Sequence, residues 1–118
     1  MAIIGLHALM YSKKADETRA FLRDVLGFQS VDAGRGWLIF AAPPAELAVH
    51  PAEGEEYHEL FLMCDDVEAT VAELKAKGVR MGDIHDRPWG RATHIVLPSG
   101  EELGLYEPRH PTAIGKNR

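Results

Sequence analysis

Two short runs of the sequence end in a side chain that can bind a metal ion or transfer a proton. The run LGLYEP, residues 103 to 108, alternates like a β-strand and ends on Glu107 and then Pro108, which cannot donate to a neighbouring strand. Half a chain earlier the run LAVHP, residues 47 to 51, ends in the same manner on His50. Carboxylates and imidazoles are ligands of divalent transition metals and also act as general acids and bases. The matching ends raise the question whether His50 and Glu107 serve one site.

The composition limits the classes of protein to which the chain can belong. A length of 118 residues predicts one domain, and the 13 basic against 18 acidic side chains, with no basic run, argue against a nucleic-acid partner. Cys64 is the single cysteine, which excludes an intrachain disulfide and favours a reducing compartment; we expect it to be a small buried apolar residue. The start, MAIIGLHALMYS, is typical neither of a signal peptide nor of a membrane span. We therefore expect a soluble cytoplasmic protein that does not interact with membranes.

The first half of the chain reads as a strand, a helix and three further strands. Residues 3 to 11 are apolar and β-prone. Residues 13 to 27 change to a helical period, with Phe21, Leu22 and Val25 on one face and Gly27 as the stop. Short extended runs follow at 28 to 33, 36 to 42 and 45 to 51, separated by glycines and prolines.

The second half repeats this order. A strand at 57 to 64 precedes a helix that begins after Asp65 and Asp66 and ends at Gly78, and strands follow at 79 to 85, 91 to 98 and 101 to 108. An internal βαβββ duplication explains both halves. We therefore expect a single domain over residues 1 to 110, with modules of about 1 to 53 and 54 to 110, and a tail at 111 to 118.

Three stretches and this duplication resemble the vicinal oxygen chelate superfamily, which includes glyoxalase I, extradiol dioxygenases, methylmalonyl-CoA epimerase and bleomycin or fosfomycin resistance proteins. The stretches are HALMYSKKADETRAFLRDVLGF, DDVEATVAELKAKGV and WGRATHIVLPSGEELGLYEP. The resemblance implies an α+β fold in which tandem βαβββ modules form a curved mixed β-sheet around a metal site. Because two modules leave sheet edges uncovered, we also expect a homodimer.

The resemblance implies a set of metal ligands at four strand positions. His7, His50 and Glu107 match the family positions on the first, fourth and eighth strands. The fifth strand is ambiguous: counting from the DDV stretch selects Glu59, whereas the spacing to Gly78, which equals that from His7 to Gly27, selects His58. Strand alternation groups Glu59 with Phe61 and Met63, as His7 groups with Leu9 and Tyr11, and therefore favours Glu59.

The two choices imply different chemistry. His7, His50, Glu59 and Glu107 form a mixed nitrogen and oxygen set suited to Fe, Mn, Ni, Co or Zn, as in a glyoxalase-like lyase or isomerase, with Glu59 or Glu107 as general base. The set His7, His58 and Glu107 is the two-histidine, one-carboxylate arrangement of extradiol-type dioxygenases. Either set predicts a metal-dependent enzyme acting on a small oxygen-bearing organic molecule.

The second class that the resemblance implies is a metal-free protein that sequesters a small molecule, as bleomycin resistance proteins do. In that case no cofactor is needed, and an apolar cleft between two chains holds the ligand. The side chains expected to line the pocket in either class are mostly aromatic: Tyr11, Trp37, Phe40, Phe61, Trp89 and His94.

Overall fold

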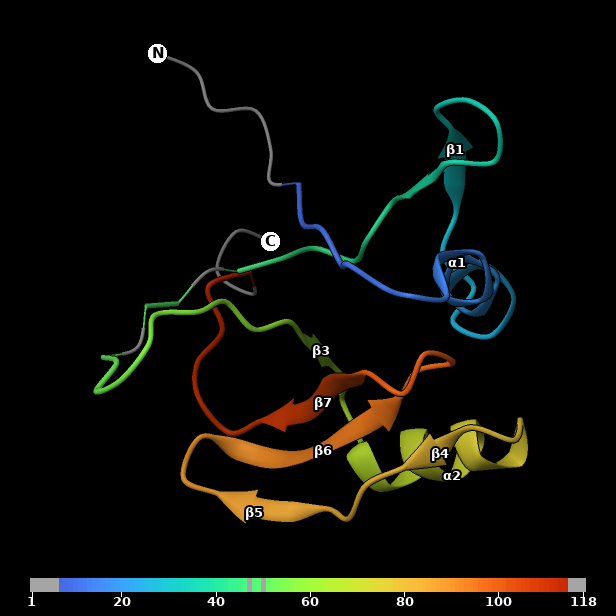
Figure 1. Cartoon of the computed structure of the whole chain (residues 1–118). Helices are drawn as coiled ribbons and strands as arrows, with labels where there is room; N and C mark the ends of the chain where they lie inside the picture. Colours follow the sequence, from blue (N-terminus) through green and yellow to red (C-terminus); the bar gives the residue numbers. More distant parts are fainter. Residues whose placement is uncertain (1–6, 47, 50, 115–118) are drawn as a thin grey trace.

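The computed structural model describes residues 7 to 46, 48 to 49 and 51 to 114. The described part is an α+β structure with two helices and seven strands, as the sequence predicts for the class. Figure 1 shows the second half of the chain as a curved mixed sheet with helix α2 against one face, while α1 and the strand β1 lie farther from that sheet.

Helix α1 (Ala15–Asp24) follows the expected pattern of charges and apolar residues. Asp16 and Glu17 lie in its first turn and Arg23 in its last, which suits the dipole of the helix. Gly27, just beyond the helix, has a φ of 74°, a conformation that residues with a side chain rarely adopt. The apolar stripe of α1, with Phe21 among its members, packs against the core of the second half.

Helix α2 (Val67–Ala76) is held at its start by Asp66, whose carboxylate accepts a hydrogen bond from the backbone N–H of Ala69 at 3.1 Å. Its buried face packs on the five-stranded sheet, where contacts with β4 and β7 are found. The buried apolar core consists of Val67, Val71, Leu74, Val79, Ile95, Leu97, Leu103 and Leu105.

The described strands form two sheets. Strands β1 (Ser30–Asp32) and β2 (Leu38–Phe40) make an antiparallel hairpin. The larger sheet has the order β3 (Phe61–Met63), β7 (Glu102–Pro108), β6 (Gly90–Val96) and β4 (Arg80–Met81), with β5 (His85–Arg87) also paired to β6. Strand β3 runs parallel to β7 and the other pairs are antiparallel, so the sheet is mixed.

The alternation along β7 defines the two faces of the larger sheet. Leu103 and Leu105 are buried in the core beside α2, whereas Gly104 and Tyr106 between and after them are only half-buried. Because successive side chains of a strand point to opposite faces, Gly104 and Tyr106 belong to the face away from α2.

The first and last strands expected in the first half do not form within the described residues. Residues 7 to 11, and the described residues 45, 46, 48, 49 and 51, have no strand pairing, while residues 1 to 6, 47 and 50 lie outside the described part. The expected strand at 79 to 85 is divided into β4 and the start of β5. Extended backbone becomes a strand only when it pairs with a neighbouring strand, and no strand pairs with the described residues of these two segments.

Candidate functional site

A pocket of about 670 Å³ lies on the face of the larger sheet away from α2. We call it the sheet pocket. Its walls come from residues 9 to 11, from the segment that leads into β3, and from β5, β6 and β7. Apolar and aromatic side chains alternate with charged ones in its lining: Leu9, Met10, Tyr11, His58, Glu59, Leu60, Phe61, His85, Arg87, Trp89, Ala92, Thr93, His94, Leu97, Glu101, Glu102, Leu103 and Gly104.

Three aromatic rings pack edge to face at one side of this pocket, and we call them the aromatic cluster: Phe61, Trp89 and Tyr106. Their centroids are 5.9 Å apart for Phe61 and Trp89, 5.6 Å for Phe61 and Tyr106, and 5.3 Å for Trp89 and Tyr106. Phe61 and Trp89 are each 40% exposed, although such rings gain most when they are buried. The cluster therefore presents an ordered aromatic surface to the pocket.

Tyr106 also contacts a residue outside the aromatic cluster. Its hydroxyl lies 2.9 Å from Nε2 of His110, with which it shares a hydrogen bond. Partial burial raises the pKa of Tyr106, and the nearby carboxylate of Glu46 raises it further, so the phenol keeps its proton at neutral pH. Tyr106 thus acts as an uncharged support for the other two rings.

Acidic and imidazole side chains border the pocket on the β6–β7 hairpin. Nε2 of His94 lies 3.3 Å from Oε2 of Glu102, and Glu101 stands beside them at the turn. The sequence pattern indicates His94 as a pocket residue but does not indicate Glu101 and Glu102, or His85 and Arg87 on β5. The signal for the glutamates was present, since the short turn LPSG between two strands implies that 94 and 102 lie near each other across the hairpin.

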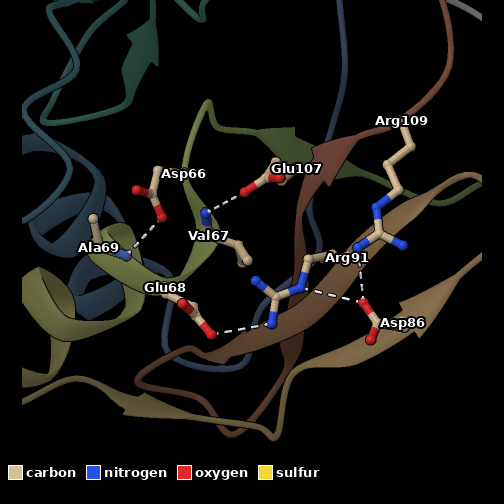
Figure 2. Close-up of polar contacts among 8 residues, drawn as sticks. All are labelled: Asp66, Val67, Glu68, Ala69, Asp86, Arg91, Glu107 and Arg109. Atoms are coloured by element: carbon tan, nitrogen blue, oxygen red, sulfur yellow. Dashed lines mark hydrogen bonds and ion pairs between the residues drawn. The ribbon is translucent and has the colours of Figure 1, made fainter.

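The carboxylate of Glu107 points to the opposite face of the sheet. Its Oε1 accepts a hydrogen bond from the backbone N–H of Val67 at 3.0 Å, at the start of α2 (Figure 2). Glu107 has the same parity along β7 as Leu103 and Leu105, whose side chains are buried beside α2. The alternation in LGLYEP therefore already contained the signal for this orientation.

Figure 2 also shows a group of ion pairs on the helix side of the sheet. Nη2 of Arg91 lies 3.1 Å from Oε1 of Glu68 on α2, and its Nε lies 3.2 Å from Oδ1 of Asp86 on β5. Arg109 contacts the same Asp86 oxygen at 3.1 Å. These contacts, with the Glu107 bond to Val67, tie the start of α2 to the sheet.

The described residues do not gather the expected metal ligands. His58 and Glu59 both line the sheet pocket, His7 is exposed and does not line it, and His50 lies outside the described residues. Among residues 7 to 46, 48 to 49 and 51 to 114, no three His, Cys, Asp or Glu side chains are placed to hold an ion. With Glu107 bonded to Val67, the arrangement does not fit an ion shared between Glu107 and the pocket, and the ligand set stays a prediction.

The expected pocket residues divide into two groups. Tyr11, Phe61, Trp89 and His94 line the sheet pocket. Trp37 and Phe40 belong instead to the β1–β2 hairpin, where the guanidinium carbon of Arg19 lies 5.1 Å from the centroid of the Trp37 ring.

Cys64 is expected to be a slow nucleophile. Its thiol donates to the carbonyl oxygen of Tyr106 at 3.5 Å, and burial raises its pKa, assisted by the carboxylates of Glu107 and Asp65. A raised pKa lowers the thiolate fraction, so iodoacetamide at pH 8 should alkylate the folded protein several-fold more slowly than the urea-unfolded chain. Mass spectrometry of timed samples measures both rates, and equal rates would contradict this expectation.

A family model and the fold agree on the class of protein. The model described as Glyoxalase/Bleomycin resistance protein/Dioxygenase superfamily matches residues 6–108 of this chain, whose described part has an α+β fold with a curved mixed sheet. The chain belongs to this superfamily, which confirms the resemblance seen in the sequence. No curated protein matches the sequence of this chain.

Solved structures agree with this assignment. The chain is similar to TnmS3, an antibiotic binding protein from Streptomyces sp. CB03234, with 26% identity, a TM-score of 0.68, and coverage of 92% of this chain and 98% of that one. It is also similar to a glyoxalase/bleomycin resistance protein from the same organism, with 26% identity, a TM-score of 0.57, and coverage of 80% and 92%. Lactoylglutathione lyase from Agrobacterium tumefaciens, at 18% identity, a TM-score of 0.64, and coverage of 88% and 92%, shares the fold.

The described part of the chain has no helix long and apolar enough to cross a membrane.

Proposed function

We propose that this protein binds a small organic molecule with flat, largely apolar rings in the sheet pocket and does not change it chemically. The observation that carries the proposal is the half-exposed aromatic cluster, in which Phe61 and Trp89 are held in fixed edge-to-face contact at the pocket wall. The 26% identity to an antibiotic binding protein over nearly the whole chain supports the same choice. We expect the site to act in the cytoplasm, where the lone Cys64 stays reduced.

The chemistry of the pocket fits such a ligand. A flat ring that covers Phe61 and Trp89 removes their apolar surface from water, and each well-oriented aromatic contact contributes about 0.5 to 1.5 kcal/mol beyond that burial. The polar rim formed by His94, Glu101 and Glu102 supplies groups that can orient a ligand against the aromatic wall.

The direct test is binding of two probes in the presence of EDTA. The neutral dye N-phenyl-1-naphthylamine reports apolar ring binding by fluorescence, and bleomycin tests an antibiotic by calorimetry. Trp89→Ala should weaken dye binding about tenfold, equivalent to ~1.4 kcal/mol. Tyr57→Ala is the matched control, because Tyr57 is exposed but does not line the pocket. Failure of both probes to saturate, or equal losses in the two variants, would reject the proposal.

A metal-dependent enzyme is the second candidate function. It is favoured by the presence of His58 and Glu59 in the lining of the same pocket. It requires Glu107 to leave the N–H of Val67, to which it is bonded in this conformation. Under this alternative, Mn, Fe, Co, Ni or Zn should raise the melting temperature, because an ion that binds only the folded state stabilises it.

That alternative has its own matched pair of variants. Glu59→Ala should remove the metal-dependent rise in melting temperature and His58→Ala should not, if the alternation favoured by the sequence is right. The opposite result would select His58 and the dioxygenase-like set. If every metal leaves the melting curve of the unaltered protein unchanged, the binding proposal stands without a metal.

We further propose that the protein is a homodimer, in which a second copy of the chain covers the edge of β3 and the exposed surface around Tyr11. Strand β3 is the end member of the strand order, so within the described sheet it pairs on one side only. The radius of gyration is 15.3 Å, whereas a compact chain of this length has about 13.5 Å. Tyr11, which lines the sheet pocket, is 85% exposed. A homodimer would cover such an edge and such apolar surface.

A further inference from the structure

Gly104 lies in the middle of β7, where the backbone conformation does not require a glycine. Its neighbours across the sheet are Phe61 on β3 and His94 on β6. Its φ is not positive, unlike that of Gly100 in the preceding turn, so any residue can adopt its conformation. Glycine within a strand weakens it and often marks a place where another group approaches the backbone closely.

The group that approaches Gly104 is the ring of Phe61. A Cβ atom at position 104 would overlap Cδ1 of that ring and would lie 2.6 Å from its Cε1 and 2.8 Å from its Cγ. Atoms without a bond between them do not come this close, and Cγ cannot be moved away by turning the ring about its own axis. The Phe61 ring therefore occupies the space that any side chain at position 104 would need.

This contact fixes one wall of the sheet pocket. The Phe61 ring packs against the backbone of Gly104, and in this position it makes edge-to-face contacts with Trp89 and Tyr106. A side chain at 104 would force a different rotamer of Phe61, and with 40% of Phe61 exposed the ring has room to move toward the pocket or toward solvent. Either movement would separate Phe61 from the other two rings.

We infer that Gly104 is a positioning residue that sets the place of the Phe61 ring and thereby the shape of the site for a flat aromatic ligand. The inference rests on the proposed function, because it concerns the same pocket. Gly104 itself offers a ligand no side chain, and its effect is transmitted through Phe61.

The binding test is a double-mutant cycle with N-phenyl-1-naphthylamine as the probe. Gly104→Ala should raise the dissociation constant about tenfold, a loss similar to that of one aromatic contact. Gly54→Ala should leave it unchanged, because Gly54 has no positive φ and no atom within 4 Å of an added Cβ. In the Phe61→Ala background, Gly104→Ala should cause no further loss. A full tenfold loss in that background would overturn the inference.

A second measurement needs no ligand and separates this inference from the proposed function. In the unaltered protein, nuclear Overhauser effects should connect the ring protons of Phe61 to the α-protons of Gly104 and to the Trp89 indole. Gly104→Ala should remove the Phe61–Trp89 effects while the melting temperature falls by no more than a few degrees. Persistence of those effects would overturn the role of Gly104 even if both probes bind, whereas their loss in a protein that binds neither probe would reject only the proposed function.

The double variant Phe61→Ala/Gly104→Ala guards against a folding failure. It removes the ring that an alanine at 104 would meet, so it should unfold cooperatively even if Gly104→Ala alone does not. A folded double variant beside an unfolded single variant would support the contact as the cause. If neither variant folds, Gly104 is required for a reason other than its contact with the Phe61 ring, and the inference is overturned.

Discussion

Glu107→Ala is expected to lower the free energy of unfolding by about 1 to 3 kcal/mol, with or without added metal ions. The substitution removes the acceptor of the Val67 N–H, and Val67 is completely buried at the start of α2. A buried donor without a partner costs the free energy of its lost hydration, and the carboxylate also interacts favourably with the positive end of the helix dipole. Urea unfolding followed by circular dichroism measures the change.

Two comparison variants separate the hydrogen bond from the charge. Glu107→Gln keeps an oxygen acceptor of the same reach, so it should lose only about 0.3 to 1 kcal/mol, the contribution of a charge near a helix terminus. Glu101→Ala removes an exposed glutamate at the β6–β7 turn and should change stability by less than about 0.5 kcal/mol. If the loss in Glu107→Ala appears only when a divalent metal is present, Glu107 is a metal ligand and the second candidate function gains its main support.

Tyr11→Asp is expected to convert a dimer of the unaltered protein into a monomer at micromolar concentration. Sedimentation equilibrium should give twice the 13.0 kDa chain mass before the substitution and the single chain mass after it. The physical reason is that burying a charged carboxylate in an apolar contact without a partner costs several kcal/mol, and each 1.4 kcal/mol weakens association about tenfold.

The matched control for this prediction is Glu73→Lys on the exposed side of α2, away from the sheet pocket. It also changes the charge of a surface residue, yet it should leave the dimer intact. If the unaltered protein is a monomer at high concentration, the proposed homodimer is rejected. Equal dissociation by both variants would show that the effect is not specific to the surface around Tyr11.

The local elements could be predicted from the sequence because their signals act over a few residues. Asp66 before α2 and Gly27 after α1 satisfy the requirements of helix ends, and the structure confirms both. The turn between β6 and β7 follows from Pro98, Ser99 and Gly100 in the same way. The duplicated order of elements and the quoted stretches were enough to predict the α+β class with a curved mixed sheet.

The composition of the site depended on contacts between distant parts of the chain. Phe61, Trp89 and Tyr106 form one cluster only because β3 pairs in parallel with β7 and the β5–β6 turn reaches the same face. The described residues of the expected first and fourth strands show the same dependence, since a β-prone segment becomes a strand only beside a partner.

Glu107 shows most clearly what the sequence determined and what the tertiary structure decided. The sequence determined that a carboxylate ends the last strand and that it alternates with Tyr106 and shares its parity with Leu105. Which face carries α2 and which carries the pocket was decided by the packing of α2 on the buried leucines of β7. That packing directs Glu107 to the N–H of Val67 and Tyr106 to the aromatic cluster, because neighbouring residues of a strand must point to opposite sides.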